Sequence, residues 1–435
     1  MSLTLTDEQS AIIHWQGQKL VVNAFSCAGK TSTVVQYALA NPYSRMLYLA
    51  YNRAVRDEVE RKFPFNVECK NSHQLAWSHF GKHYQKRRIA SLRITDVDRK
   101  LNPRHWQWVC LALTSLNQFL FSAGPGLLHL PDEDTCAGMD VSAILQAVQV
   151  RWYEKSRPDG SFPLTHDICL KLFRLPFPDL SRSRDTILSD EAQDANPETS
   201  VLVLSQPGGV ILMSDRYQQI YRFRGADNGL SLPALNDADH LWLTQSFYFG
   251  PSVVWMANLL LQCAGETRLV SGNGGCDMHA LMASPGGRKV YRVGGIEGYR
   301  VTAPEDLYWF SAEMPAKRLS DTLWLDYRDF DDTVTSEKDV DISVSTAHSS
   351  KGLKWPVVIL DEDFMDITDP QMPEDERQDE TRLLYEAATR ARQARVLNSL
   401  IRQLADEAGR NEQNQHATDM SPTEDIVQEL ESEDA

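Results

Sequence analysis

Two adjacent acidic residues, Asp190 and Glu191, follow the apolar segment RDTILS, which is typical of a short buried strand. Far upstream, the segment AFSCAGKTS (residues 24–32) begins at the end of another apolar run, KLVVNAF, and leads into a helical pattern. Backbone amides at a strand–turn–helix junction of this kind bind phosphate groups. Acids at the carboxyl end of a strand are suited to hold Mg²⁺ and to orient a water molecule. The two segments together predict an ATP site.

The chemistry of the side chains assigns a role to each residue of this predicted site. We expect Lys30 to reach the β- and γ-phosphate oxygens, and Thr31 to ligate Mg²⁺ together with Asp190. Glu191 is expected to orient and deprotonate the attacking water. A chance turn could produce GKT alone, and acids at strand ends also cap helices, but the combination favours a site for ATP and Mg²⁺. The residues expected to contact the nucleotide through the loop are Ala28, Gly29, Lys30, Thr31 and Ser32.

Short apolar strands alternate with helical patterns in two stretches of the chain, which predicts an α/β fold built on parallel sheets. The first stretch is interrupted by helical and then Pro-rich sequence, and the second by a Gly-rich interval with little helical periodicity. The polar, acidic C-terminal segment is expected to be mostly disordered. The boundaries that we infer are 1–77 with 181–245 for the first lobe, 78–180 for its mainly helical insertion, 246–265 with 341–403 for the second lobe, 266–340 for its shortened insertion, and 404–435 for the acidic tail.

The composition of the 435-residue chain is that of a soluble globular protein, with 42% hydrophobic and 24% charged residues. The formal net charge of -16 is unusual for a protein that binds nucleic acid, but much of the acid lies in 361–380 and in the tail. The segment 82–104 is basic, which is compatible with a DNA path and equally with a solvated helix face.

The cysteine pattern and the absence of long apolar runs bear on the cellular compartment. Seven scattered cysteines without a CxxC pair argue against zinc, iron–sulfur and disulfide frameworks, and favour a reducing environment. No apolar run approaches the roughly 18 residues that a membrane span needs, and the first residues show no signal-peptide pattern. We therefore expect a cytoplasmic protein without a membrane partner, associated with the nucleoid in a bacterium, and a nuclear location stays open.

DEAQD at 190–194 and SDRYQQIYRFRGA at 214–226 resemble motifs II and III of the UvrD/Rep-type superfamily 1 DNA helicases. Within that family, CKNSHQLAW, DGSFPLTHDICLKL and LTQSFYFG most resemble the F-box DNA helicases, and we expect no F-box before the helicase motifs. Other segments resemble the remaining motifs in the family's order, so the resemblance extends over about residues 3–400. They are LTDEQ (5–9, the Q motif), LYLAYNRAV (47–55, motif Ia), NSHQLAW (71–77, motif Ib), LTQSFYFG (243–250, motif IV), VSTAHSSKGLKW (344–355, motif V) and LLYEAATRAR (383–392, motif VI).

The resemblance implies an α/β fold with two RecA-like P-loop lobes, a helical insertion in the first lobe and a shortened insertion in the second. It also implies further roles around ATP, in which Gln9 reads the adenine edge and Phe247 stacks on the adenine. Gln218 would sense the γ-phosphate and couple it to DNA. Arg390 would be the arginine finger that stabilises the transferring phosphoryl group. The residues expected to take part in catalysis are Lys30, Glu191, Gln218 and Arg390.

For DNA, the resemblance implies that one strand passes across both lobes, with 3′-to-5′ travel as ATP closes and reopens them. A motor of this kind holds bases by aromatic stacking and phosphates by hydrogen bonds. Phe223 is the expected base-stacking wedge, although packing in the core is the alternative for a single phenylalanine. The residues expected on the path of single-stranded DNA are Tyr51, Asn52, His73, Phe223, Arg224, His348 and Ser349.

Four departures from the family pattern bear on activity. Phe25 and Cys27 stand where the phosphate loop has glycines, and a non-glycine residue at positive φ costs about 1–3 kcal/mol. Tyr248 replaces an arginine that contacts the γ-phosphate, and the loss of such a donor typically costs about 100- to 1000-fold in rate. Lys354 replaces an acid near the ribose, although its charge could partly substitute for that of the missing arginine. The interval between motifs IV and V is too short for the full accessory domain of the family.

Two functions stay open on the sequence alone. The first is an ATP-dependent single-stranded DNA translocase or helicase that works at a reduced rate and serves recombination or repair. The second is a helicase-derived regulatory protein that binds DNA or nucleotide with little or no ATP turnover, and whose acidic tail docks a protein partner. The first is favoured because the residues expected to hold metal, water and phosphate are all present.

Overall fold

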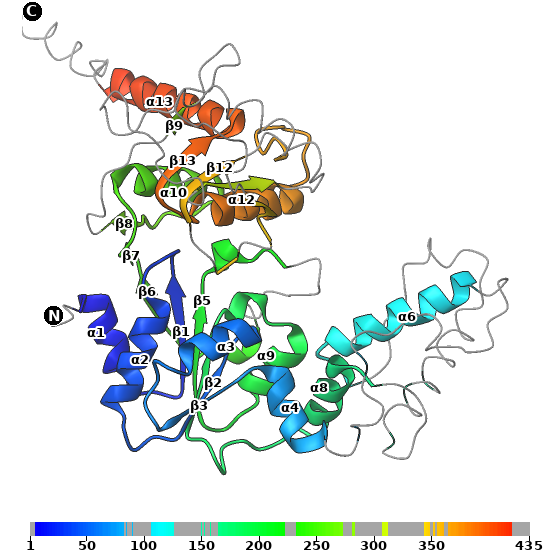
Figure 1. Cartoon of the computed structure of the whole chain (residues 1–435). Coiled ribbons are helices and arrows are strands. Elements are labelled where there is room, and N and C mark those ends of the chain that lie inside the picture. Colours follow the sequence, from blue (N-terminus) through cyan, green and yellow to red (C-terminus); the bar gives the residue numbers. More distant parts are fainter. Residues whose placement is uncertain are drawn as a thin grey trace, which may run out of the picture. The chain divides into compact units, whose positions relative to one another are not determined.

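The chain divides into two compact units, Met1–Thr244 and Gln245–Ala435, in a computed structural model (Figure 1). The division lies one residue before the lobe boundary expected from the sequence. Each unit is built on its own parallel sheet. The residues that the structure describes are 5–81, 84, 89, 106–125, 149, 152, 157, 164–221, 232–272, 281–282, 307–311, 343–348, 351–352, 355–360 and 364–419.

Unit 1 is built on a six-stranded parallel sheet with the strand order β3-β2-β4-β5-β1-β6. The strands β2 and β4 are buried at every residue, because helices cover both faces of the sheet. This arrangement explains why the strands are continuous apolar runs in the sequence, and it confirms the predicted α/β fold. The strands are β1 (Lys19–Ala24), β2 (Met46–Leu49), β3 (Val67–Lys70), β4 (Thr186–Ser189), β5 (Gly209–Ser214) and β6 (Asp239–Leu243).

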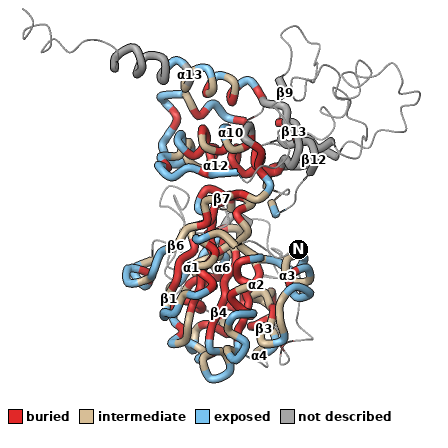
Figure 2. Tube along the Cα trace, turned by 90° about the vertical axis from the view of Figure 1, so that its left-hand side faces the viewer, coloured by how far each residue is buried: buried red, intermediate tan, exposed pale blue. Residues whose placement is uncertain are grey.

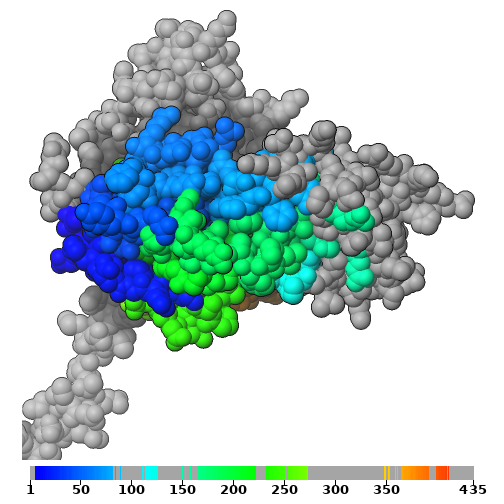
Figure 3. Space-filling view, turned by 90° about the horizontal axis from the view of Figure 1, so that it is seen from below, coloured from blue at the N-terminus to red at the C-terminus, as the bar shows by residue number. Residues whose placement is uncertain are grey.

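Two hydrophobic clusters flank this sheet, since successive strand residues point to opposite faces. One cluster joins the sheet to α1, α2 and α3, and the other joins it to α4, α6, α8 and α9, as the buried segments in Figure 2 indicate. In the view from below, early residues of this unit (blue) lie beside residues beyond about 165 (green) (Figure 3). They lie side by side because strands from these two parts of the chain alternate in the sheet. The helices are α1 (Asp7–Ile13), α2 (Lys30–Ala40), α3 (Arg53–Val59), α4 (Ser72–Phe80), α6 (Trp106–Phe121), α8 (His166–Arg174) and α9 (Pro197–Leu204), with the short 3-10 helices η3 (Ala192–Asp194), η4 (Arg216–Gln218) and η7 (Pro233–Leu235).

A buried ion network joins α8 to α9 and to the chain that follows α6. The carboxylate of Glu198 accepts from Lys171 Nζ at 3.0 Å and from Arg174 Nε at 2.6 Å, and all three side chains are almost fully buried. Lys171 also donates to the carbonyl oxygens of Ser122 and Gly124. Burial lowers the pKa of Lys171, whereas Glu198 raises it. The network therefore fixes the end of the inserted helix α6 to the helix that follows the acidic pair.

Unit 2 contains a five-stranded parallel sheet with the order β11-β10-β12-β13-β9. Two very short strands, β7 and β8, form a separate pair. No helix among the described residues is long and apolar enough to cross a membrane. The elements are β7 (Gln245–Ser246), α10 (Pro251–Cys263), β8 (Ser271–Gly272), β9 (Leu281–Met282), β10 (Leu307–Ser311), β11 (Ser343–Thr346), β12 (Trp355–Leu360), α12 (Glu374–Ala388), β13 (Ala391–Leu397) and α13 (Ser399–Asp419).

The structure differs from the expected organisation of unit 2 in two places. Strands β9 and β10 belong to its sheet, although they lie inside the interval 266–340 that the sequence indicates as an insertion. Helix α13 continues to Asp419, whereas the sequence predicts a disordered tail from residue 404 onward. The helix is held at its start because Ile401 and Leu404, three residues apart on one face, are buried. Residues 420–435 lie outside the described part of the chain.

Candidate nucleotide and DNA site

The predicted phosphate loop joins β1 to α2 and ends at Gly29, which has φ 81°. Cys27 also has positive φ, at 62°, so one of the two replaced glycines does stand where glycine is favoured. Its backbone is therefore strained by about 1–3 kcal/mol. The hydroxyl groups of Ser32 and Thr33 donate to the Gly29 carbonyl at 2.8 and 2.9 Å, which secures the turn to the first turn of α2.

Phe25, the other replaced glycine, does not have positive φ. Its side chain is buried, with the ring centroid 6.2 Å from that of Tyr217 and 6.0 Å from that of Trp242. The phenylalanine is thus part of the core under the loop. Of the two residues that replace glycines in the loop, only Cys27 has a strained backbone.

The acidic pair follows β4 directly, at the carboxyl edge of the sheet. Burial, and then the neighbouring carboxylate of Glu191, raise the pKa of Asp190 to about 6, against the opposing effect of Lys30. Asp190 Oδ2 accepts a hydrogen bond from the hydroxyl of Tyr48, and its Oδ1 accepts from the Glu191 amide at 3.0 Å. Burial also raises the pKa of Tyr48 well above its ordinary value, so the tyrosine is the donor. Lys30 Nζ lies 3.6 Å from Glu191 Oε1.

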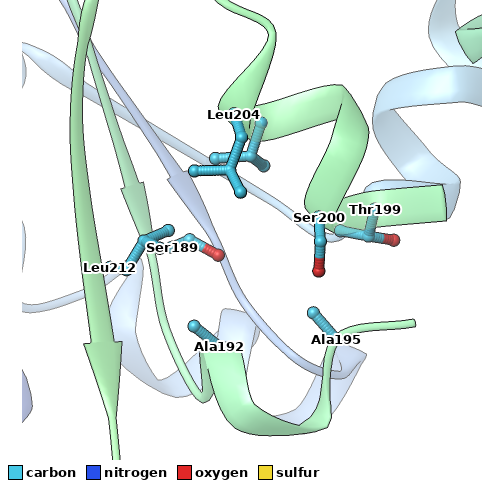
Figure 4. A pocket seen from close by; sticks show the side chains of 8 residues that line it. Ser189, Ala192, Ala195, Thr199, Ser200, Leu204 and Leu212 are labelled. Atoms are coloured by element: carbon cyan, nitrogen blue, oxygen red, sulfur yellow. The ribbon is translucent and has the colours of Figure 1, made fainter. Parts of the chain in front are cut away.

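The backbone at Glu191 is left-handed, with φ 49° and ψ 45°, which a glutamate adopts at a cost of about 1–3 kcal/mol. The residues that follow Glu191 lie beside β5 and α9. Side chains of these elements line a small cavity of about 10 Å³, too small for more than one water (Figure 4). The residues labelled around it are Ser189, Ala192, Ala195, Thr199, Ser200, Leu204 and Leu212.

Gln193 connects the acidic pair to the segment that follows β5. Its side-chain amide nitrogen donates to Glu191 Oε2, and its Oε1 accepts from the Asp215 amide at 3.1 Å. Its carbonyl accepts from Gln219 Nε2 at 2.9 Å. Gln218, which the resemblance assigns to sensing the γ-phosphate, lies in η4 beside these contacts and is buried. The two motifs are therefore one hydrogen-bonded unit.

Gln9, which the resemblance assigns to the adenine edge, is buried and already bonded within unit 1. Its Oε1 accepts from the Thr6 amide at 3.2 Å, and its Nε2 donates to Thr33 Oγ1 at 3.1 Å. Gln9 therefore links α1 to the first turn of α2. One N–H and one lone pair of its amide are left for a base edge, and its role in nucleotide binding stays a prediction.

A groove of about 640 Å³ runs from the acidic pair over the carboxyl edge of β2 toward α4 and α8. Its lining includes Tyr51, Asn52 and His73, three of the residues expected on the DNA path. The Tyr51 ring is stacked against that of Tyr221, with centroids 5.6 Å apart and an interplanar angle of 19°. His73 Nε2 lies 3.0 Å from Asp167 Oδ1. The structure thus brings part of the expected DNA path and the expected ATP chemistry to one groove.

Unit 2 holds the other expected ATP residues. Arg390 is buried, and its Nη2 donates to Glu386 Oε2 at 3.2 Å while its Nε donates to the Glu386 carbonyl at 3.1 Å. Phe247 and His348 are half-buried, and Tyr248 is 50% exposed. Three of the expected DNA residues (Phe223, Arg224 and Ser349) and Lys354 lie outside the described residues.

Three residues of the site were missed in the sequence: Tyr48, Gln193 and Tyr221. Gln193 lies inside the DEAQD segment and Tyr221 inside SDRYQQIYRFRGA, so both could have been inferred from those motifs. Tyr48 lies inside the segment LYLAYNRAV, but nothing local points to its contact with Asp190, because that contact depends on how β2 pairs with β4.

The donor set fits a magnesium–nucleotide complex better than a metal held by protein alone. Among the described residues, no group of three or more His, Cys, Asp or Glu side chains could hold a metal ion. Mg²⁺ in nucleotide sites typically takes one or two protein oxygens and completes its shell with phosphate and water. Asp190 and Thr31 are suitable oxygen ligands. Burial raises the pKa of Asp190, whereas a bound cation would favour its charged form.

Comparison with known proteins adds three findings. Residues 341–397 match the family model of the UvrD-like helicase C-terminal domain. The chain is 27% identical to F-box DNA helicase 1 of Gallus gallus over an alignment of 512 residues, which covers 93% of this chain and 50% of that relative. It is 31% identical to F-box DNA helicase protein 1 of Schizosaccharomyces pombe over 301 residues, which covers 62% of this chain and 34% of that relative. The chain thus spans half the length of these relatives or less.

Proposed function

We propose that this chain, which is related to the UvrD-like superfamily 1 helicases of the F-box DNA helicase branch, is a DNA helicase. In this proposal it couples ATP hydrolysis to movement along single-stranded DNA. One observation supports this most: the groove of unit 1 is lined by Asp190 and Glu191 and also by Tyr51, Asn52 and His73. Residues suited to hydrolyse ATP and residues suited to hold a DNA strand therefore share one cavity.

ATP bound with Mg²⁺ supplies the γ-phosphoryl group whose transfer to water drives such a motor. In our proposal the phosphates are bound by the loop amides, the N-terminus of α2 and Lys30, while Thr31 and Asp190 hold the metal. Glu191 orients the attacking water and takes its proton. Arg390 is the arginine finger in this proposal, and its positive charge stabilises the charge that develops on the phosphoryl group.

Coupling to DNA would pass through the segment that follows β5. Gln193 bonds to Glu191 on one side and to the Asp215 amide on the other, and Tyr221 lies a few residues further along the same segment. A shift of this segment on hydrolysis would move the Tyr51–Tyr221 stack in the groove. We propose that repeated shifts of this kind advance the protein in the 3′-to-5′ direction.

A second candidate function is a regulatory protein that binds nucleotide or DNA with little turnover. Two observations favour it: the strained backbone at Cys27, and the uncharged Tyr248 at a position where an arginine is expected. Strain in the phosphate loop and one missing donor would both slow hydrolysis. The two functions differ in one measurable respect, which is whether single-stranded DNA stimulates ATP hydrolysis.

The experiment measures ATP hydrolysis against the concentration of single-stranded DNA for the wild-type protein and for Tyr51→Ala. The loss of one base-stacking ring typically costs about 1–3 kcal/mol, so half-maximal stimulation should need about 5- to 150-fold more DNA. Tyr43→Ala is the matched control, because Tyr43 is 98% exposed and does not line the groove. It should behave as the wild type does. Hydrolysis that DNA does not stimulate would leave only the regulatory function.

We further propose a cytoplasmic or nuclear protein of recombination or repair, with the acidic segment 420–435 as the site for a protein partner. The segment begins after α13, so a truncation at residue 404 would cut through a packed helix, since Leu404 is buried. Deletion after Asp419 is the cleaner test. This deletion should leave DNA-stimulated hydrolysis unchanged and abolish the binding of a partner identified with the full chain. A partner that binds equally well without the segment would contradict this part of the proposal.

A further inference from the structure

Tyr48 lies in the middle of β2 and is completely buried. Its neighbours in the strand, Leu47 and Leu49, are apolar, and its ring packs against Phe63 with centroids 4.8 Å apart. Phenylalanine would fill this space equally well, and a buried hydroxyl destabilises the fold unless it is hydrogen-bonded. The hydroxyl of Tyr48 is therefore the feature that packing alone does not explain.

That hydroxyl donates to Asp190 Oδ2. The pairing of β2 with β4 sets this contact, because Tyr48 stands opposite Leu188, two residues before the aspartate. On the other side, Asp190 Oδ1 accepts from the Glu191 amide at 3.0 Å. Each carboxylate oxygen thus has one hydrogen bond, and the plane of the carboxylate is fixed. Each oxygen keeps a further lone pair for a metal ion or a metal-bound water.

We propose that Tyr48 is a positioning residue that orients Asp190 toward the Mg²⁺ of a bound nucleotide. The inference rests on the proposed role of Asp190 in nucleotide binding. It adds a residue that lies in the motif Ia segment but to which the resemblance assigns no role. Hydrogen-bond partners behind a metal ligand typically change metal affinity by about 10- to 100-fold when they are removed. Tyr48 is not itself a ligand in this scheme, since it reaches the metal only through the aspartate.

The test measures the affinity of a fluorescent, non-hydrolysable ATP analogue in EDTA and over a range of Mg²⁺ concentrations, without DNA. For Tyr48→Phe, binding in EDTA should equal that of the wild type, because the phosphate loop is untouched. The Mg²⁺ concentration for half-maximal tightening should rise about 10- to 100-fold. Tyr37→Phe is the matched control, since Tyr37 is a buried tyrosine of the same core that does not touch the acidic pair, and its Mg²⁺ dependence should be that of the wild type.

A Tyr48→Phe protein with the wild-type Mg²⁺ dependence would overturn the inference. A second comparison tests whether Tyr48 acts through the aspartate: Asp190→Asn alone against Asp190→Asn with Tyr48→Phe. Equal Mg²⁺ dependence is expected for these two proteins, and an additional loss in the double variant would mean that Tyr48 acts by another route. Because the readout is binding, a protein that binds Mg²⁺ with nucleotide but shows no DNA-stimulated hydrolysis would contradict the proposed function and leave this inference standing. A wild type without Mg²⁺-dependent tightening would overturn both.

Discussion

The ammonium group of Lys30 lies 3.6 Å from the carboxylate of Glu191. The phosphate-loop lysine and the acid that follows β4 therefore form an ion pair within unit 1, and both side chains are largely shielded from solvent. In our account this pair has to open when nucleotide binds, because Lys30 then turns to the phosphates and Glu191 to the attacking water. Glu191 thus competes with the nucleotide for the lysine.

This competition gives the first prediction. Glu191→Gln should bind an ATP analogue at least as tightly as the wild type does, since it frees Lys30 from its carboxylate partner. Lys30→Ala should weaken binding by about 10-fold or more, because a hydrogen bond to a charged group is worth about 1.5–3 kcal/mol. Equilibrium titration with a fluorescent analogue measures both values. Weaker binding by Glu191→Gln would show that the ion pair does not oppose the nucleotide.

How much of this site was predictable from the sequence depends on the range of each contact. That Lys30 lies close to the acidic pair was predictable, because phosphate loops and acid pairs at strand ends are local patterns. The contact of Tyr48 with Asp190, 142 residues apart in the chain, was not, since it depends on the register of β2 and β4.

Two further features, the backbone of the phosphate loop and the helix at the end of the chain, could not be predicted from local sequence either. Two residues, Phe25 and Cys27, replace glycines, yet only the folded loop reveals that Cys27 alone has positive φ. The helical part of the acidic C-terminal segment was missed for another reason. Its charge suggested disorder, whereas the buried Ile401 and Leu404 hold α13 in place.

The positive φ of Cys27 makes a prediction about stability. Cys27→Gly should be neutral or stabilising by up to about 1 kcal/mol, because strain is relieved while the unfolded chain gains freedom. Cys110→Gly is the control, since Cys110 lies inside helix α6, where glycine costs about 1 kcal/mol. Urea denaturation of the two variants should give changes in the free energy of unfolding that are of opposite sign or of clearly different size. Equal destabilisation would mean that the loop at Cys27 is not strained.

The buried network around Glu198 makes a further prediction. Glu198→Gln leaves the charges of Lys171 and Arg174 buried without their carboxylate, which typically costs about 3–5 kcal/mol. The exposed pair of Glu58, on α3, with Lys62, beyond the end of that helix, gives the matched control, and Glu58→Gln should change stability by no more than about 1 kcal/mol. Thermal unfolding compares the variants. A Glu198→Gln protein as stable as its control would contradict the structural role assigned to this network.

Arg390 gives the prediction for unit 2. Arg390→Ala should lower DNA-stimulated ATP hydrolysis by about 1000-fold or more, as the loss of an arginine finger does, and should leave DNA binding unchanged. Arg402→Ala, on helix α13, is a suitable control, and its rate should be that of the wild type. Rates are measured at saturating ATP and DNA. A rate for Arg390→Ala within a few-fold of the wild type would remove this residue from the proposed mechanism.

The central claim is that Asp190 and Glu191 serve ATP hydrolysis that is coupled to a DNA strand. The most direct measurement is the rate of ATP hydrolysis by the wild type and by Glu191→Gln, each with and without single-stranded DNA. We predict that DNA stimulates the wild type, and that Glu191→Gln loses about 100-fold or more of the stimulated rate while it still binds DNA. A wild type that DNA does not stimulate, or a Glu191→Gln protein that hydrolyses ATP at the wild-type rate, would contradict the claim.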